Sequence, residues 1–544
     1  MAFELGAFDG RTGDPPRGTS RWGTLDADYL DWLVDVHAAS IQQHFWRLWD
    51  YYANPMSDAC GGSAADRKVS ESGRCYIQAQ EVGLPSRITG LARSPHGGAL
   101  GVQPVRDIQR KEVVIENDIA WRVNAAADFL FGKPVTLISR ASDGRKRRDI
   151  EAILKALFAA NGGPGFFQDM AVLGSVYGFV DCLIRAPQTQ DAFGNLRSRH
   201  PLSETPSLAC SLPASPGPRP SDTPGDPLSP VLQWAQAIDL ELIEAPRALP
   251  VLDEDDYRTI RLYVQHFHQK KNAITAKGSF LARILGAAGS RSDPRPVVAV
   301  TEILSPDYWQ RYENKELVAE GPLPWGFLPI VHIQNIAQPY SYEGVSDVEP
   351  LIPLQDELNT RLSDRASRIT FQSFKMYLGK GIEGFENKPV APGRMWCTDN
   401  PDASIQEFGG DLAAPSEQAH IAEIREAMDK ASGVTPVVAG ILQDRLGNLT
   451  SATALRLTFM GMLSRNERKR RTYGEGIRKI CRMVLSMLDT AGVYATGDSD
   501  RDVEIAFASP LPENLMEKLQ EAQIKRDLGV PQDQILKELG YETK

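Results

Sequence analysis

The sequence predicts an α+β protein, and three observations support this fold class. Residues 346–374 repeat apolar side chains at spacings of three and four, as a long helix requires. Residues 451–490 form a second long helical pattern that is apolar at both ends and basic in its middle. Residues 257–335 contain aromatic and β-branched runs that favour strands and loops. Long helices beside a β-rich segment are typical of α+β folds.

Shorter elements precede and follow these three segments. Apolar side chains at helical spacing predict helices over 25–52, 112–131, 149–160, 165–176 and 415–431. Runs of β-branched and apolar residues predict strands at 180–184, 238–243 and 503–507. Near the end, Gly529 and Pro531 separate two small helices, about 512–527 and 531–539.

Composition limits the classes of function. The chain has 544 residues and a formal charge of -10, so it is no general nucleic-acid binder, although local basic residues could still handle DNA. Its six cysteines are scattered without metal-ligand spacing, which favours free thiols. No stretch reaches the roughly 18 apolar residues of a membrane span, so no membrane association is expected.

Residues 187–230 interrupt the ordered pattern. They contain many prolines and serines and few large apolar side chains. Such a composition cannot bury enough surface to fold alone, so we interpret the segment as a long surface insertion. Residues 276–296 similarly predict an exposed loop.

The sequence lacks the local motifs of common enzymes. It has no phosphate-binding GxxxxGK[ST] loop, no GxSxG elbow, no HExxH and no EF-hand loop. His266 and His268 would share one face of a strand, but no third ligand of matching type stands nearby, so packing is the better interpretation. The acidic run 253–256 indicates a solvated segment, with nuclease carboxylates as the alternative. We therefore expect no catalytic, cofactor-binding or metal site.

Several segments, taken in order, resemble the portal proteins of tailed bacteriophages, especially the group typified by SPP-type siphophages. Two are NDIAWRVNAAADFLFGKPV at 117–135 and GSVYGFVDCLIR at 174–185. The most specific is WGFLPIVHIQN at 325–335, followed by GVSDVEPLIPLQDELNTRLSDRAS at 344–367. The others are SGVTPVVAG at 432–440, LTSATALRLTF at 449–459 and GVPQDQILKELG at 529–540. Each motif is weak by itself, and their shared order carries the resemblance.

The resemblance implies a portal fold with long stem and wing helices, small β-rich wing and clip regions, and a ring with a central channel. It implies these parts in chain order: a wing over 25–245, a first stem helix over 250–272, a clip over 273–335, a second stem helix over 346–374, a wing return over 375–499 with a tunnel loop at about 408–416, and a crown over 500–544.

The resemblance also implies which residues approach DNA. The tunnel loop would present Gly409, Gly410, Asp411 and Leu412 to the DNA. The stem helix 346–374 would line the channel through Asp356, Glu357, Arg361, Asp364, Arg365 and Arg368. Their nearly balanced charge suits a wall past which a polyanion must slide, because each fixed cation that neutralises a phosphate adds affinity.

The implied function is a DNA channel at one capsid vertex, without catalytic activity. The expected partners are other copies in a homododecameric ring, double-stranded DNA, the terminase large subunit, the major capsid and scaffolding proteins, and a head-completion or adaptor protein. The expected location is the virion, after assembly in the host cytoplasm. Two alternatives stay open: a packaging-associated nuclease or protease, and a helical scaffold protein.

Overall fold

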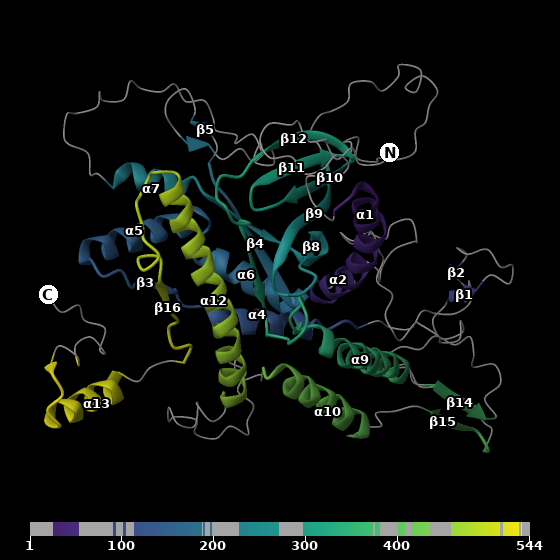
Figure 1. Cartoon of the computed structure of the whole chain (residues 1–544). Coiled ribbons are helices and arrows are strands. Elements are labelled where there is room, and N and C mark those ends of the chain that lie inside the picture. Colours follow the sequence, from purple (N-terminus) through teal and green to yellow (C-terminus); the bar gives the residue numbers. More distant parts are fainter. Residues whose placement is uncertain are drawn as a thin grey trace, which may run out of the picture. The chain divides into compact units, whose positions relative to one another are not determined.

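The structure is a computed structural model that describes residues 25–53, 91–93, 102–104, 114–187, 189–190, 196–197, 228–270, 297–373, 376–380, 401–408, 415–434, 459–511, 515–532 and 535. The chain divides into two compact units. Unit 1 comprises residues 1–49, 122–348 and 434–544, and unit 2 comprises residues 50–121 and 349–433. Figure 1 shows the helices and strands of both units.

Unit 1 begins with the helical segment expected over 25–52. It consists of α1 (Ala27–Trp32), a π-helical turn (Leu33–His37) and α2 (Ala38–Ala53). The Asp26 carboxylate caps α1 by accepting a hydrogen bond from the Tyr29 N–H at 2.7 Å. The buried side of the segment packs on the larger sheet described below, through Leu30, Leu33 and Val34.

A three-stranded antiparallel sheet lies at the centre of unit 1, in the order β13–β4–β7. Its strands are β13 (Ile330–Gln334), β4 (Phe179–Arg185) and β7 (Asp239–Ile243), which confirms the strands expected at 180–184 and 238–243. The first six residues of β4 are all buried, because it is the central strand and helices cover it. The register pairs Cys182 with Leu242 on one side and Val331 on the other.

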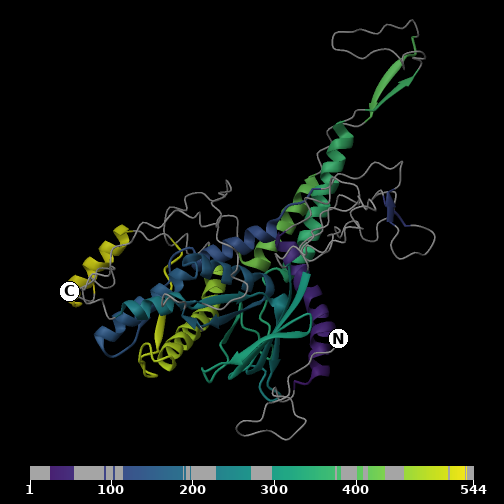
Figure 2. The ribbon, with the colours of Figure 1, turned by 90° about the horizontal axis from the view of Figure 1, so that it is seen from above.

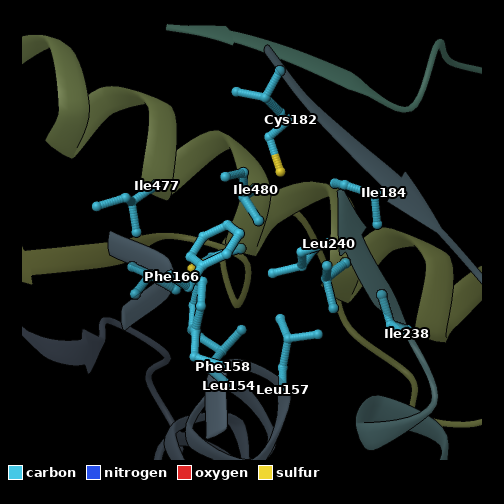
Figure 3. Packing of buried hydrophobic residues seen from close by; sticks show 14 of the residues in the cluster. Leu154, Leu157, Phe158, Phe166, Cys182, Ile184, Ile238, Leu240, Ile477 and Ile480 are labelled. Atoms are coloured by element: carbon cyan, nitrogen blue, oxygen red, sulfur yellow. The ribbon is translucent and has the colours of Figure 1, made fainter. Parts of the chain in front are cut away.

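Five of the described helices build the main core of unit 1 around this sheet. They are α4 (Asp118–Phe131), α5 (Gly144–Ala160), α6 (Pro164–Tyr177), the short α7 (Ser229–Gln236) and α12 (Met460–Thr490). Figure 3 shows Leu154, Leu157 and Phe158 of α5 converging with Ile477 and Ile480 of α12 near Cys182. Each fully buried side chain of this size contributes about 1.5–3 kcal/mol. The core therefore holds α12 against the sheet.

A second, five-stranded antiparallel sheet also lies in unit 1. Its order is β12–β11–β10–β9–β8. The strands are β8 (Ala248–Leu252), β9 (Ile260–Lys270), β10 (Val297–Leu304), β11 (Tyr308–Glu313) and β12 (Glu316–Pro322). Elsewhere in unit 1, β3 (Thr136–Ser139) pairs with β16 (Val503–Ala506), and α7 leads into β7.

This sheet overturns the expectation of a first stem helix over 250–272. Its described part contains the end of β8 and the whole of β9, because Leu262 and Val264 point into the core with two-residue alternation and β9 pairs with β10 over 263–270 and with β8 over 260–265. Cross-strand pairing, which a local pattern does not reveal, decided the conformation. Residues 276–296 and most of 187–230 lie outside the described residues, apart from the short strands β5 (Thr189–Gln190) and β6 (Leu196–Arg197).

Among the described residues, unit 2 contains two complete helices and two antiparallel strand pairs, one of which is β1 (Leu91–Arg93) with β2 (Val102–Pro104). α9 (Ile352–Ser373) is followed by the antiparallel pair β14 (Met376–Lys380) and β15 (Ser404–Phe408), and then by α10 (Pro415–Ser432). α9 contacts α10, and Figure 2 shows the β14–β15 hairpin continuing beyond the end of α9. The helix expected over 415–431 is confirmed.

The helix expected over 346–374 begins later than predicted. A short 3-10 turn (Glu349–Leu351) precedes α9, which starts at Ile352. Ser346 does not cap it, because its hydroxyl donates to the Val176 carbonyl at 2.6 Å and accepts from the Val348 N–H at 3.0 Å. At the chain's end, α13 (Leu515–Asp527) confirms the helix expected over 512–527.

Candidate functional site

The helix α9 carries the charged residues that the sequence places at the channel. One stripe of α9 is buried in unit 2 and includes Leu358 and Leu362. The charged side chains lie off this stripe and are partly exposed, namely Asp356, Glu357, Arg361, Asp364, Arg365 and Arg368. The helical period therefore separates an apolar stripe from a charged surface, as the sequence predicted.

Most of these charges are paired within unit 2. Arg361 lies 2.7 Å from Glu357 and 3.3 Å from Asp364, at the i,i+4 and i,i+3 spacings of a helix. The Tyr51 hydroxyl donates to the Asp356 carboxylate at 2.8 Å. Hydrogen bonding from Arg361 lowers the pKa of Glu357, so this carboxylate is ionised at neutral pH. The pairs leave little net charge along this part of the helix.

Two further pairs join α9 to α10. The His420 Nε2 lies 3.2 Å from Glu357, and Arg368 forms an ion pair with Glu417. Arg365 differs from its neighbours: within the described ranges, no carboxylate pairs with it. Half-exposed pairs of this kind contribute only about 0–1 kcal/mol each, so their main effect is on the surface potential rather than on stability.

A row of polar side chains on the buried stripe of α9 was missed by the sequence analysis. Gln355, Asn359 and Ser363 recur every four residues and are buried. They bind the backbone of the segment before α4: the Asn359 Oδ1 accepts from the Glu116 N–H at 3.0 Å, and the Ser363 Oγ accepts from the Val114 N–H at 2.9 Å. Their spacing on an otherwise apolar stripe was the signal that could have revealed them.

Unit 1 contains a buried ionic cluster that the sequence analysis did not identify. Asp347 lies 2.6 Å from Arg465 and also pairs with Lys469, whose Nζ donates to the Ser175 Oγ at 2.8 Å. Burial alone would raise the pKa of Asp347, but the attraction of Lys469 and Arg465 outweighs it and lowers that pKa to about 2. The cluster ties α12 to the segment before α9.

The remaining expectations concern the tunnel loop and the pair of histidines, and the structure describes only the histidines. The tunnel-loop residues Gly409, Gly410, Asp411 and Leu412 lie outside the described residues. His266 and His268 do share a strand, with ring centroids 5.4 Å apart, and burial lowers the pKa of His266 to about 4. Among the described residues, no cluster of three or more His, Cys, Asp or Glu side chains could hold a metal, and no helix is long and apolar enough to cross a membrane.

Comparison with known proteins gives a family for this chain. Residues 233–543 match the family model for phage portal protein, SPP1 Gp6-like. No curated protein matches. Two solved structures that resemble the chain are titled "Virion of native gene transfer agent (GTA) particle" and "Neck of empty GTA particle computed with C6 symmetry". The first has 13% identity and a TM-score of 0.40, covering 78% of this chain and 90% of that one; the second has 13% identity and a TM-score of 0.38, covering 79% and 91%.

The family match covers more than half of the chain and includes α9, α10 and α12. It agrees with the resemblance found in the ordered sequence motifs. Portal proteins are structural rather than enzymatic, and they act as the portal or connector of a virus particle. The chain belongs to the SPP1 Gp6-like family of phage portal proteins.

Proposed function

We propose that the chain forms a ring whose central channel carries double-stranded DNA, packaged by a separate terminase and later released into the tail. The observation that carries this proposal is the family match over 233–543, which includes the charged helix α9. The ring itself has no catalytic role in this proposal. It is a component of the virion, assembled in the host cytoplasm.

We place the stem and clip differently from the sequence expectation. Because β8 and β9 take up most of the described part of 250–272, this segment cannot supply a stem helix. The chain has a helix, a β element and a second helix in that order at α9, the β14–β15 hairpin and α10. The helices α9 and α10 contact each other. In this placement α9 and α10 are the two stem helices and the hairpin is the clip. The two sheets and the core of unit 1 then belong to the wing.

The charges of α9 support a channel wall past which DNA slides. A strong row of free cations would hold phosphates by counterion release. Here Arg361 is held by two carboxylates and Arg368 by Glu417, so few cations are free to bind. Arg365 is the residue on this helix that we expect to be attracted most strongly to the DNA phosphates.

The partners follow from this role. The ring would contact the terminase large subunit during packaging, the major capsid and scaffolding proteins during assembly, and a head-completion or adaptor protein afterwards. The clip, at the β14–β15 hairpin, is the surface we assign to the terminase and the adaptor.

The mass of the purified protein in solution tests the ring. One chain has a mass of 59.9 kDa, so native mass spectrometry should find a complex of about twelve such masses, and electron microscopy should show a central channel. A protein that stays monomeric or dimeric across the micromolar range would support the helical-scaffold alternative instead. Cleavage of DNA incubated with the purified protein and magnesium would favour the nuclease alternative.

A further inference from the structure

The outer face of α1 carries an apolar row that the core of unit 1 does not use. Tyr29, Trp32 and Val36 follow one another at spacings of three and four, and they are 39%, 45% and 58% exposed. The Trp32 ring stacks on Tyr29 at 5.7 Å and on His37 at 5.1 Å. These contacts keep the indole in place on the surface. We call Tyr29, Trp32 and Val36 the aromatic ridge.

Acidic residues surround the aromatic ridge. The segment carries Asp26, Asp28, Asp31 and Asp35, and Lys315 pairs with two of them, Asp31 at 2.6 Å and Asp35 at 2.8 Å. Asp28 is exposed and forms no ion pair within the described part of the chain. The ridge is therefore an apolar surface with an excess of negative charge.

A groove of complementary character lies elsewhere on unit 1. It has a volume of about 890 Å³ and lies between α12 and the segment that contains β13. Much of its lining is apolar, including Phe327, Ile330 and Met483. We call it the basic groove, because Arg258, Arg471 and Lys479 line it against a single acid, Glu475.

Two of these cations have no ion-pair partner within the part of the chain that the structure describes. Arg471 and Lys479 are exposed, and among the described residues no carboxylate pairs with either of them. Glu475, which lies between them on the same face of α12, pairs with Arg478 instead. The basic groove is apolar and carries unpaired cations, and the aromatic ridge is apolar and has an unpaired aspartate beside it. The two surfaces are therefore complementary in both apolar character and charge.

The two surfaces lie on different sides of unit 1. Figures 1 and 2 both show the sheets of unit 1 between α1, which carries the ridge, and α12, which forms one wall of the groove. Two different complementary patches on one subunit give a head-to-tail contact, which closes into a ring when the rotation allows. A single self-complementary patch would stop at a dimer.

We propose that the aromatic ridge of one copy docks in the basic groove of the next copy, with Trp32 in the apolar part and Asp28 facing Arg471 and Lys479. This inference rests on the proposed ring. Apolar burial supplies the affinity, and the opposite charges select the head-to-tail orientation. The partner is a second copy of this chain, and the contact repeats around the ring.

Two variants of the full chain test the contact. A ridge variant carries Trp32→Ala with Asp28→Ala, and a groove variant carries Arg471→Glu with Lys479→Glu, so that the two altered surfaces do not attract each other in the mixture. Each variant alone should lose assembly, with apparent affinity between copies at least about tenfold weaker than in the unaltered chain. Mixed in equal amounts, they should form dimers that grow no further, because only one intact ridge and one intact groove remain to meet. Mass photometry measures the size of the complexes formed by each variant alone and by the mixture.

Matched controls separate this contact from general damage. Val318→Asp, at an exposed position on β12, should leave assembly unchanged. Thermal unfolding checks that each variant folds, and Val36→Asp replaces the ridge variant if that one does not. Normal assembly of either variant, or a mixture that stays monomeric, overturns the docking contact while the ring stands. An unaltered chain that never assembles overturns the ring and the contact together.

Discussion

Replacing Asp347 by Asn should destabilise unit 1 strongly, because it leaves a cation buried without its counter-charge. The Asp347 side chain is 8% exposed and that of Lys469 is 3% exposed. Removing one partner of a buried ion pair costs about 3–5 kcal/mol. Arg465 cannot compensate, because it carries the same sign as Lys469. We therefore expect Asp347→Asn to lower the free energy of unfolding by about 3 kcal/mol or more.

The exposed pair between Arg140 and Glu504 provides the matched control. It is 2.7 Å long, but its side chains are 58% and 49% exposed. Glu504→Gln should therefore cost less than about 1 kcal/mol. Urea unfolding followed by tryptophan fluorescence measures both variants. Equal midpoints for Asp347→Asn and Glu504→Gln would refute the assignment of Asp347 to a buried, paired state.

The same carboxylate predicts a dependence on pH. Its pKa falls from the ordinary 3.8 to about 2 in the folded chain, which corresponds to a contribution on the order of 2 kcal/mol. A carboxyl group whose pKa is lowered by folding stabilises the folded chain at any pH above its pKa in the unfolded chain. This stabilisation is lost as the pH falls toward its pKa in the folded chain. Between pH 5 and pH 3 the unaltered protein should lose about 1 kcal/mol from this group, a loss that Asp347→Asn should not show.

Three further predictions concern packing, a buried hydrogen bond and the proline-rich segment. Gly174→Ala should lower the unfolding midpoint, because a Cβ there would collide with the Tyr473 hydroxyl, whereas Gly165→Ala on the same helix meets nothing within 4 Å and should not. Asn359→Ala should cost about 1–3 kcal/mol in urea unfolding, because the partly buried Glu116 N–H and the buried Gln355 amide lose an acceptor; a loss below about 0.5 kcal/mol would contradict this. Deleting 198–227 should leave assembly intact by mass photometry, given its proline-rich composition, and a deletion variant that stays monomeric would make this segment an assembly element.

Elements with a strong local period could be read directly from the sequence. The helix expected over 415–431 is α10 at Pro415–Ser432, and the strand expected over 238–243 is β7 at Asp239–Ile243. In both cases the side-chain period matches the conformation that the tertiary structure keeps. The ordered motifs likewise indicated the portal family that the match over 233–543 shows.

Positions whose partners lie far along the chain were decided only by the tertiary structure. Ile260–Lys270 forms the strand β9 rather than a helix because β10, more than 25 residues later, pairs with it. Ser346 and Asp347 left the expected helix because α6 and α12 hold them. A local pattern reports the period of a segment but not the group that satisfies each buried polar atom. The sequence alone therefore determined the fold class, most element types and the family, whereas long-range pairing and burial decided where α9 begins and which charges are buried.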